Sequence, residues 1–448
     1  MRAQPVDCLT LSRKQLRMLK CRQLAPVWFL LVLVTAARTA DERRPEDWIR
    51  SHAIRLQSVE AGHGFDDMQP LAGVVGDARL VALGEATHGT REFFQLKHRM
   101  VEFLASQKGF TIFSIEANMP EAYRLNDFVL KGEGDPKQLL KGMYFWTWDT
   151  DEFLKMILWM REFNRQGKGR IQFTGFDMQT PKLAMKIVQS FVATNDRSFE
   201  TTVDPIYDEV TQRTRKTWSD EESPSQKLSD HLMAGKCRDV IEHLDQNRAG
   251  FLQAGLEAET VDWVIQNARI VLQYALLQSG EQSRDQSMAE NVEWIADHNP
   301  GAKIVLWAAN GHVRYAPFPD FTPTGRYLHE RFGRGMVSFG FSFNEGSFRA
   351  VETGRIPREF TVKPLPKGSL DRTLASAGIP LFALDLRDLP KDGPVARWFA
   401  KPHAMRNIGG VYSEKGGDSP DPIASTSWPQ AFDVIVFVDK TTASRGNP

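Results

Sequence analysis

The chain has 448 residues, of which 42% are hydrophobic and 25% are charged, a balance typical of a globular protein with a large core. Its formal net charge is zero, but residues 1–40 carry seven Lys and Arg against one acid, so the rest of the chain has a net charge of −6. A mildly acidic body argues against nucleic acid as a partner.

The first 40 residues have the three parts of an export signal. A basic stretch precedes the apolar run Ala25–Val34, and small residues follow it at positions 35–37. The run is shorter than the roughly 20 residues of a membrane span. We therefore predict a signal peptide or signal-like segment over residues 1–40, a protein exported to the periplasm or outside the cell, and no stable membrane span. The alternative interpretation is an uncleaved anchor or a disordered tail.

A short apolar run, a polar turn and a helical pattern then follow one another. Leu80–Leu83 suits a buried strand of a parallel sheet, and the residues after Thr90, which is placed to cap a helix, repeat apolar side chains at spacings near 3.6. Glu85 and His88 lie in the turn, at the carboxyl end of the strand, where open α/β sheets build their sites. A carboxylate and an imidazole three residues apart can act there as an orienting group and a general base.

Further strands are predicted by three apolar runs that alternate with helical patterns: Phe110–Ile115, Arg170–Phe176 and Ala302–Ala308. Such alternation is typical of a parallel sheet covered by helices. We therefore predict an α/β fold with a mostly parallel central sheet flanked by helices.

Between about residues 182 and 283 the strand signals vanish, which predicts a large all-helical insertion. The helical patterns there are Pro205–Trp218, Gln226–Leu252 and Glu257–Ser279. Cys237 lies in one of them and is expected to be a buried, inert thiol. Short strands are expected again near the C-terminus. These are Val337–Phe343 and Phe348–Val351, joined as an antiparallel pair at residues 344–346, then Leu381–Leu386 and Asp433–Val438.

Each of the four strands that alternate with helices is followed by ionisable side chains. These are Glu85 with His88, Glu116, Asp177 and His312. One such residue alone is usually only solvated at a strand end. If the four strands are parallel neighbours, however, all these groups meet at one edge of the sheet, which predicts a site.

The chemistry of that site follows from the residue types. The sequence has no G-x-S-x-G elbow, no H-E-x-x-H, no C-x-x-C and no phosphate-binding loop motif. Histidine and carboxylates remain. An imidazole with a pKa near about 6.5 can take a proton from water, and a carboxylate on its other nitrogen fixes the tautomer. Lys97 lies one helix face away and is expected near the carboxylates.

Several segments resemble the erythromycin esterase family over most of residues 45–443. The matching segments are Gly84–Thr90, Ser114–Ala117, Phe145–Thr150, Gly175–Gln179, Arg284 and Asp285 with Met288, Ala289 and Asn291, Trp307 with Ala308, Asn310 and His312, and Phe432 with Asp433. The resemblance implies a single erythromycin-esterase-like α/β domain over residues 41–448. It also implies hydrolysis of small-molecule carboxylic esters or lactones by a histidine-activated water, with no required metal or other cofactor. Macrolide lactones such as erythromycin are among the candidate substrates.

The resemblance further assigns roles to single residues. His88 matches the family's general base, Glu85, Glu116 and Lys97 match positions tied to that base, and His312 matches a second active-site histidine. In one place the sequence departs from the family pattern, because Ala309 stands where the family often has a further histidine.

Three supporting residues have two interpretations each. Trp148 belongs to an aromatic segment that either lines an apolar cleft or forms part of the core. Arg284 and Asp285 follow the helical insertion. They either hold the segment after the insertion beside the site or form an ion pair at a helix start, which would contribute little to stability.

Two other functions fit the same residues. His88, His312, Glu85 and Glu116 could ligate a divalent metal, which would make the protein a metal-dependent hydrolase, although their spacing matches no metal-ligand motif. A non-catalytic envelope-associated binding protein is the other alternative, and Ala309 is the residue that motivates it.

Overall fold

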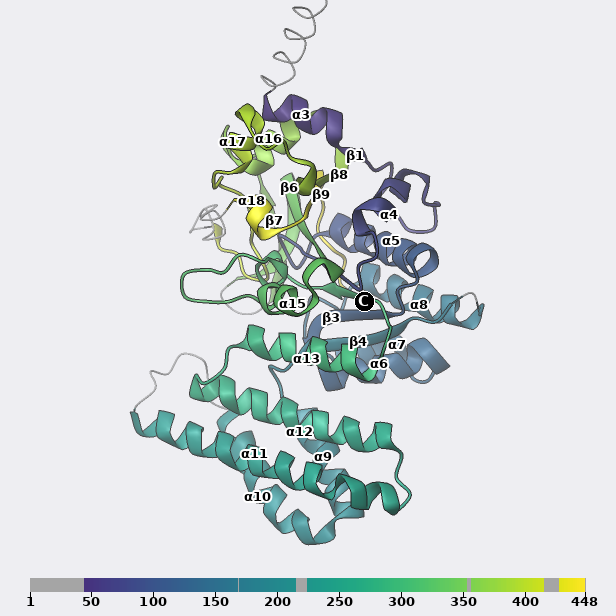
Figure 1. The fold of residues 1–448 in the computed structure, drawn as a ribbon, viewed down its shortest axis with the longest axis vertical. Coiled ribbons are helices and arrows are strands. Elements are labelled where there is room, and N and C mark those ends of the chain that lie inside the picture. The colour runs from purple at the N-terminus through teal and green to yellow at the C-terminus, as the bar shows by residue number, and fades with distance from the viewer. Residues whose placement is uncertain (1–43, 168, 215–223, 353–355, 415–426, 448) are drawn as a thin grey trace, which may run out of the picture.

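The structure, a computed structural model, describes residues 44–447 apart from 168, 215–223, 353–355 and 415–426. Helices pack on both sides of a central sheet, and a group of long helices extends from one end (Figure 1). The strands are β1 (Ile54–Arg55), β2 (Leu80–Leu83), β3 (Ile112–Asn118), β4 (Gln172–Asp177), β5 (Ile304–Trp307), β6 (Met336–Val351), β7 (Pro357–Val362), β8 (Leu381–Asp385) and β9 (Val434–Thr441).

Sixteen α-helices connect and cover these strands within the described residues. They are α3 (Pro45–His52), α4 (Gln69–Val75), α5 (Arg91–Lys108), α6 (Met119–Lys131), α7 (Pro136–Lys141), α8 (Asp151–Arg165), α9 (Lys182–Asn195), α10 (Arg197–Thr214), α11 (Pro224–Gln253), α12 (Ala258–Ser279), α13 (Arg284–His298), α14 (Asn310–Val313), α15 (Thr324–Phe332), α16 (Leu370–Ser376), α17 (Gly393–Phe399) and α18 (Trp428–Ala431).

The strands form one sheet in the order β1-β8-β9-β6-β2-β5-β3-β4, with β7 added to β6. The six strands from β9 to β4 are parallel to their neighbours, whereas β1, β7 and β8 pair antiparallel. The predicted α/β fold with a mostly parallel sheet is thus confirmed. The four strands that precede the predicted site residues, β2, β5, β3 and β4, are consecutive neighbours, so their carboxyl ends share one edge of the sheet.

Alternate residues of the central strands pack into two separate cores. Leu80 and Ala82 belong to the core on one face, and Val81 and Leu83 belong to the core on the other. All four side chains are fully buried. A strand covered on both faces reads as a continuous apolar run, and this explains why the sequence predicted β2 with its observed bounds.

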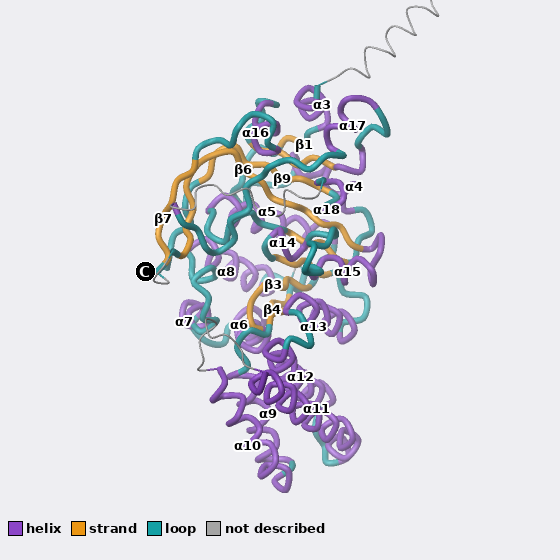
Figure 2. Tube along the Cα trace, turned by 90° about the vertical axis from the view of Figure 1, so that its left-hand side faces the viewer, coloured by secondary structure: helices purple, strands orange, loops and turns teal. Residues whose placement is uncertain are grey.

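The prediction of a hairpin within residues 337–351 is wrong. These residues form one strand, β6, which runs parallel to β9 and carries β7 along its far half. Figure 2 shows β6 and β7 curving away from the rest of the sheet. Gly346 has a φ of +130° at this bend, and a side chain there would come within 2.2 Å of the Thr441 carbonyl oxygen. The glycine therefore allows the strand to bend and continue where the sequence predicted a turn.

The predicted helical insertion consists of four helices, α9 to α12, rather than three. Their side chains join the core on one face of the sheet, and Figure 1 shows them as a layer beyond α13. Cys237 on α11 is buried, and burial raises the pKa of its thiol to about 12, as expected of an inert cysteine.

The predicted signal segment lies outside the described residues, and export of the protein stays a prediction. Among the helices that the structure describes, none combines the length and the apolar composition of a membrane span.

Candidate active site

The turn between β2 and α5 is shaped by close backbone contacts. A side chain at Gly84 would lie 2.2 Å from the Asn310 Oδ1 atom, so only glycine fits between β2 and α14. The hydroxyl groups of Thr87 and Thr90 are 2.6 Å apart. Thr90 is the N-cap residue of α5, as predicted, but its hydroxyl contacts Thr87 and makes no cap hydrogen bond.

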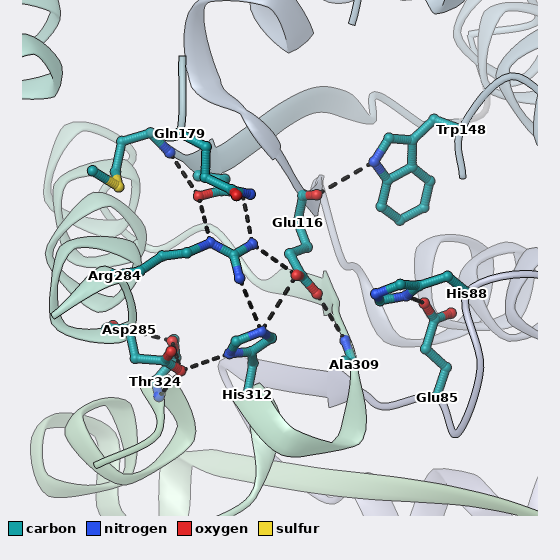
Figure 3. A network of polar contacts seen from close by, with 12 residues as sticks. Glu85, His88, Glu116, Trp148, Gln179, Arg284, Asp285, Ala309, His312 and Thr324 are labelled. Atoms are coloured by element: carbon teal, nitrogen blue, oxygen red, sulfur yellow. Dashed lines mark hydrogen bonds and ion pairs between the residues drawn. The ribbon is translucent and has the colours of Figure 1, made fainter. Parts of the chain in front are cut away.

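Glu85 is fully buried and is bound by three polar groups, of which Figure 3 shows His88. Lys97 Nζ donates to its Oε2 atom at 2.8 Å and Trp307 Nε1 donates to the same atom at 2.5 Å. His88 Nδ1 lies 2.6 Å from Oε1. Burial alone raises the pKa of Glu85, but the charge of Lys97 and the bond to His88 outweigh it and leave the pKa below its usual value. Glu85 is therefore a carboxylate at neutral pH.

Lys97 lies beside Glu85, as the sequence predicted, and is fully buried. Its ammonium is 4.1 Å from the ring centroid of Trp307 and 5.0 Å from that of Phe341. Burial lowers its pKa to about 8, although Glu85 pulls in the opposite direction. A cation held among aromatic rings and one carboxylate keeps that carboxylate charged without contacting the solvent.

His88 keeps 21% of its side chain exposed while Nδ1 is held by Glu85. Its ring rests against Gly410, where an added Cβ would come within 2.8 Å of the His88 Cδ2 atom. Burial lowers the pKa of His88, but the hydrogen bond and charge of Glu85, together with Glu116, raise it more, so the net pKa is above the usual value. Figure 3 shows its other nitrogen facing the side of Glu116 and Ala309.

A second group of charges is built around Arg284. This guanidinium donates from Nη2 to Glu116 Oε1 at 2.7 Å and to Asp177 Oδ2 at 2.7 Å, and from Nε to Asp177 Oδ1 at 3.1 Å. Burial raises the pKa of Glu116, but His312 and Arg284 lower it far more, so it stays ionised. The interpretation of Arg284 as an anchor beside the site fits these contacts better than that of a solvated helix-start pair.

His312 belongs to this second group. Its Nε2 atom lies 3.1 Å from Arg284 Nη1 and 3.4 Å from Glu116 Oε1, and its Nδ1 atom lies 2.8 Å from Asp285 Oδ1. Burial lowers the pKa of His312, but the two carboxylates raise it to about 10. At neutral pH the His312 imidazole is therefore a cation. The His88 imidazole differs from it in its surroundings, because one carboxylate, that of Glu85, is in contact with it.

Thr324 completes the group and was not predicted from the sequence. Its hydroxyl donates to the Asp285 carbonyl at 3.0 Å and to Asp285 Oδ1 at 2.9 Å, and its backbone N–H donates to Oδ1 at 2.8 Å. Thr324 opens α15, far from α13 in sequence, so its place beside Asp285 follows from the packing of these two helices and not from any local motif.

The structure favours one of the two interpretations of Trp148 and shows what Ala309 contributes. Trp148 is 2% exposed and packs against Phe94, Phe153 and Trp307, so it belongs to the core and does not line an apolar cleft. Its Nε1 atom donates to the Glu116 carbonyl at 3.3 Å and thereby supports the end of β3. Ala309 has no imidazole to offer, but its backbone N–H donates to Glu116 Oε2 at 2.9 Å.

The carboxylates that could ligate a metal are already bound by protein groups. Glu85 accepts from Lys97 and Trp307, and Glu116 accepts from Arg284 and Ala309. Within the described residues, no group of three or more His, Cys, Asp or Glu side chains is arranged to hold a metal ion. The carboxylates of Glu85 and Glu116 therefore fit a site for an organic substrate better than they fit a metal centre.

The chain is similar to known proteins in sequence and in fold. The sequence profile of the erythromycin esterase family matches residues 105–441. The chain is 25% identical over 386 residues to erythromycin esterase type II of Escherichia coli, which covers 78% of this chain and 90% of that protein. A solved structure of a Bacillus cereus protein has a TM-score of 0.77 at 25% identity and covers 90% of this chain and 98% of its own.

A variant of the erythromycin esterase EreC, solved in its open conformation, shares the fold. Its TM-score is 0.60 at 17% identity, and the superposition covers 84% of this chain and 94% of that one. The profile match spans about three quarters of the chain and includes Glu116, Asp177, Arg284, Asp285 and His312. The chain belongs to the erythromycin esterase family.

Proposed function

We propose that this protein is a hydrolase that cleaves carboxylic esters with a water molecule activated by His88. The observation that carries the proposal is the Glu85–His88 pair. One imidazole nitrogen is held by a buried carboxylate at 2.6 Å, while the ring keeps part of its surface exposed beside the Arg284 group. This is the arrangement that a general base requires.

The reaction begins with neutral His88. Its Nε2 atom takes a proton from a water molecule, and the resulting hydroxide oxygen adds to the carbonyl carbon of the ester. Glu85, kept ionised by Lys97, stabilises the imidazolium that forms. The tetrahedral intermediate then collapses, the bond to the alkoxy oxygen breaks, and the proton held by His88 goes to the departing alcohol. Acid and alcohol are the products, and His88 is neutral again.

Arg284 and His312 supply positive charge on the other side of the site. Both are cations at neutral pH, and both keep about a fifth of their side chains exposed. A cation positioned before the reaction stabilises the oxyanion of the tetrahedral intermediate more than the neutral carbonyl, which lowers the barrier. Glu116, Asp177 and Asp285 hold these cations in place.

Macrolide lactones such as erythromycin are the substrate class that we propose first. A lactone is an internal ester, so the same water attack opens its ring. The support is membership of the erythromycin esterase family and similarity to a relative of that name in Escherichia coli. With Ala309 in place of an imidazole, acid and base chemistry rests on His88 and His312.

Substitution of His88 tests the proposal. His88→Ala should reduce kcat for ester or lactone hydrolysis by on the order of 10²–10⁴-fold, the usual contribution of a general base. His98→Gln serves as the matched control, because His98 lies on the same helix α5 but faces Glu102 and has no contact with Glu85. Hydrolysis at the wild-type rate by a His88→Ala protein with an unchanged circular dichroism spectrum would defeat the proposal.

The metal-dependent alternative makes a different prediction. If Glu85, Glu116 and the two histidines held a catalytic ion, prolonged dialysis against a chelator would abolish turnover and added metal would restore it. Since the carboxylates are bound by Lys97 and Arg284, we expect the dialysed protein to keep its kcat. Elemental analysis of the same sample shows whether dialysis was complete.

A further inference from the structure

An open cleft of about 480 Å³ lies beside the turn that carries His88. It is lined by the start of α5, the β6–β7 pair and the C-terminal segment after β9. Figure 2 shows the C-terminal end of the chain next to β7. The lining residues include four arginines and one glutamate: Arg91, Arg349, Arg358, Arg445 and Glu359. None of the residues assigned to hydrolysis lines this cleft.

The four arginines differ in how far carboxylates neutralise them. Arg358 donates from Nη2 to Glu352 Oε2 at 2.6 Å, and Arg91 Nε lies 3.5 Å from Glu152 Oε1. The guanidinium groups of Arg349 and Arg445 form no ion pair within the part of the chain that the structure describes, although the Arg445 backbone N–H donates to Glu152 Oε2 at 3.0 Å. Two guanidinium groups of the cleft therefore have no carboxylate in direct contact.

Arg349 is the more enclosed of these two. Its Nη1 atom is buried and has no hydrogen-bond acceptor among the described residues. The guanidinium lies 5.6 Å from the ring centroid of Trp146. Burial lowers the pKa of Arg349, and Asp149 and Glu152 offset this only in part. A half-buried guanidinium without an acceptor is a costly arrangement that an anionic ligand would relieve.

Ser444 is a second unsatisfied donor in the same cleft. The residue is 3% exposed, and its hydroxyl has no hydrogen-bond partner within the described chain. The cleft also includes Arg91, the first residue of α5, but the N-terminus of this helix is already met by the Glu92 carboxylate, which accepts hydrogen bonds from Thr442. A buried hydroxyl and two guanidinium groups without ion pairs thus line one cleft.

We propose that this cleft is a binding site for a small organic anion carrying a carboxylate, phosphate or sulfate group. The planar fork of an arginine matches the two oxygens of such a group, and the cleft volume is within the range of small-molecule sites. Arg349 and Arg445 would bind the oxyanion, and the Ser444 hydroxyl would donate to it. The site is separate from the hydrolytic one and does not depend on the proposed ester hydrolysis.

Occupancy of this site would be transmitted to the His88 turn through the backbone. The N–H groups of Arg349 and Ser444 both donate to the Gly89 carbonyl, at 3.0 and 2.9 Å. A ligand that fixes the side chains of these two residues therefore stabilises the backbone next to the general base. Bound anion is expected to raise the Tm of the protein.

The test uses inorganic phosphate as the probe at constant ionic strength, with chloride as the compensating anion. Phosphate should raise the Tm of the wild-type protein in a saturable manner. Arg349→Gln and Arg445→Gln should each weaken phosphate binding by about tenfold or more, the loss expected for one charge-assisted hydrogen bond. Arg358→Gln is the matched control from the same cleft, and its effect should be smaller because Glu352 already neutralises it.

Three results would overturn the proposal. The first is a wild-type Tm that responds to phosphate no more than to chloride. The second is an equal loss in the Arg358→Gln and Arg445→Gln proteins, which would indicate general surface charge. The third is loss of phosphate binding in a His312→Gln protein, which would place the anion at the hydrolytic site. Arg445 is exposed, so its variant keeps the test valid if Arg349→Gln fails to fold.

Discussion

His88 and His312 are the same residue type in different electrostatic environments. His88 touches one carboxylate, whereas His312 lies between Glu116 and Asp285, which raise its pKa to about 10. The pKa of His88 is also raised, because the hydrogen bond and charge of Glu85 outweigh the effect of burial. In the proposed reaction His88 accepts a proton and His312 supplies positive charge, and this difference follows from the neighbours of each ring.

The pH dependence of hydrolysis follows from the state of His88. The base must be neutral to take a proton from water, and its folded pKa lies above the usual value of about 6.5 for histidine. Activity is therefore lost as the pH falls through that raised pKa. We expect the acid limb of a kcat/KM profile to have its midpoint above 6.5.

His98→Gln is the control for this profile. Burial lowers the pKa of His98 to about 4, so this residue does not titrate where His88 does. The acid limb should therefore be unmoved in this variant. A wild-type midpoint at or below 6.5 would contradict the assignment of the base.

Thr324 is a positioning residue whose effect is predicted through His312. Thr324→Val removes the hydroxyl that donates to Asp285 while keeping the size of the side chain. Asp285 then holds His312 Nδ1 less firmly. We expect kcat to fall about tenfold, equivalent to one hydrogen bond of roughly 1.4 kcal/mol, with KM little changed.

Thr324→Ser separates this role from a merely structural one. The serine keeps the hydroxyl and loses only a methyl group, so it should recover most of the wild-type kcat. If the serine and valine variants are equally slow, Thr324 acts through packing and the hydrogen bond has no separate effect.

Among the elements, the loop after residue 405 limits the position of the His88 ring. The Gly410 site has no room for a methyl group, because a Cβ would lie 2.8 Å from His88 Cδ2. Gly410→Ala should displace the ring from Glu85 and reduce kcat by more than tenfold, since small errors in the position of a base are costly. Gly235→Ala on α11 has open space around it and should leave kcat unchanged. Crystal structures of the two variants would show whether the ring has moved.

The sequence predicted buried, parallel elements better than those whose course depends on a distant partner. β2 and β5 read as short apolar runs because both of their faces are covered. The sequence predicted two strands in place of β6, because residues 344–346 resemble a turn. In the structure these residues stay extended, because β6 pairs with β9 as far as Gly346. α10 was expected to begin at Pro205, a residue favoured at helix starts, but the helix begins at Arg197 and runs through the proline.

For the site, the prediction depended on a rule about whole sheets. Neighbouring parallel strands bring their carboxyl ends together, so Glu85, Glu116, Asp177 and His312 could be grouped without any structure. The contacts of Thr324 and the enclosed position of Trp148 could not, because they depend on how α15 packs on α13 and how aromatic side chains fill a core. The amino-acid sequence contains many threonines and tryptophans, and their local patterns do not show which threonine lies beside Asp285 or which tryptophan is enclosed in the core.

At the scale of the whole molecule, the hydrolytic site draws on distant parts of the chain. Glu85 and Trp307, which share a hydrogen bond, are separated by 222 residues. On the edge of β2 that faces away from β5, the neighbouring strand is β6. The carbonyl of Gly89, next to His88, is bound by Ser444 almost at the end of the sequence. Pairings of this kind form late and slowly, because long loops must close first.

The two hydrogen bonds to the Gly89 carbonyl tie the turn at His88 both to β6 and to the segment after β9. Local opening of either segment would therefore release the backbone beside His88 before the sheet itself unfolds. Hydrogen exchange at the Ser444 amide would report such an opening.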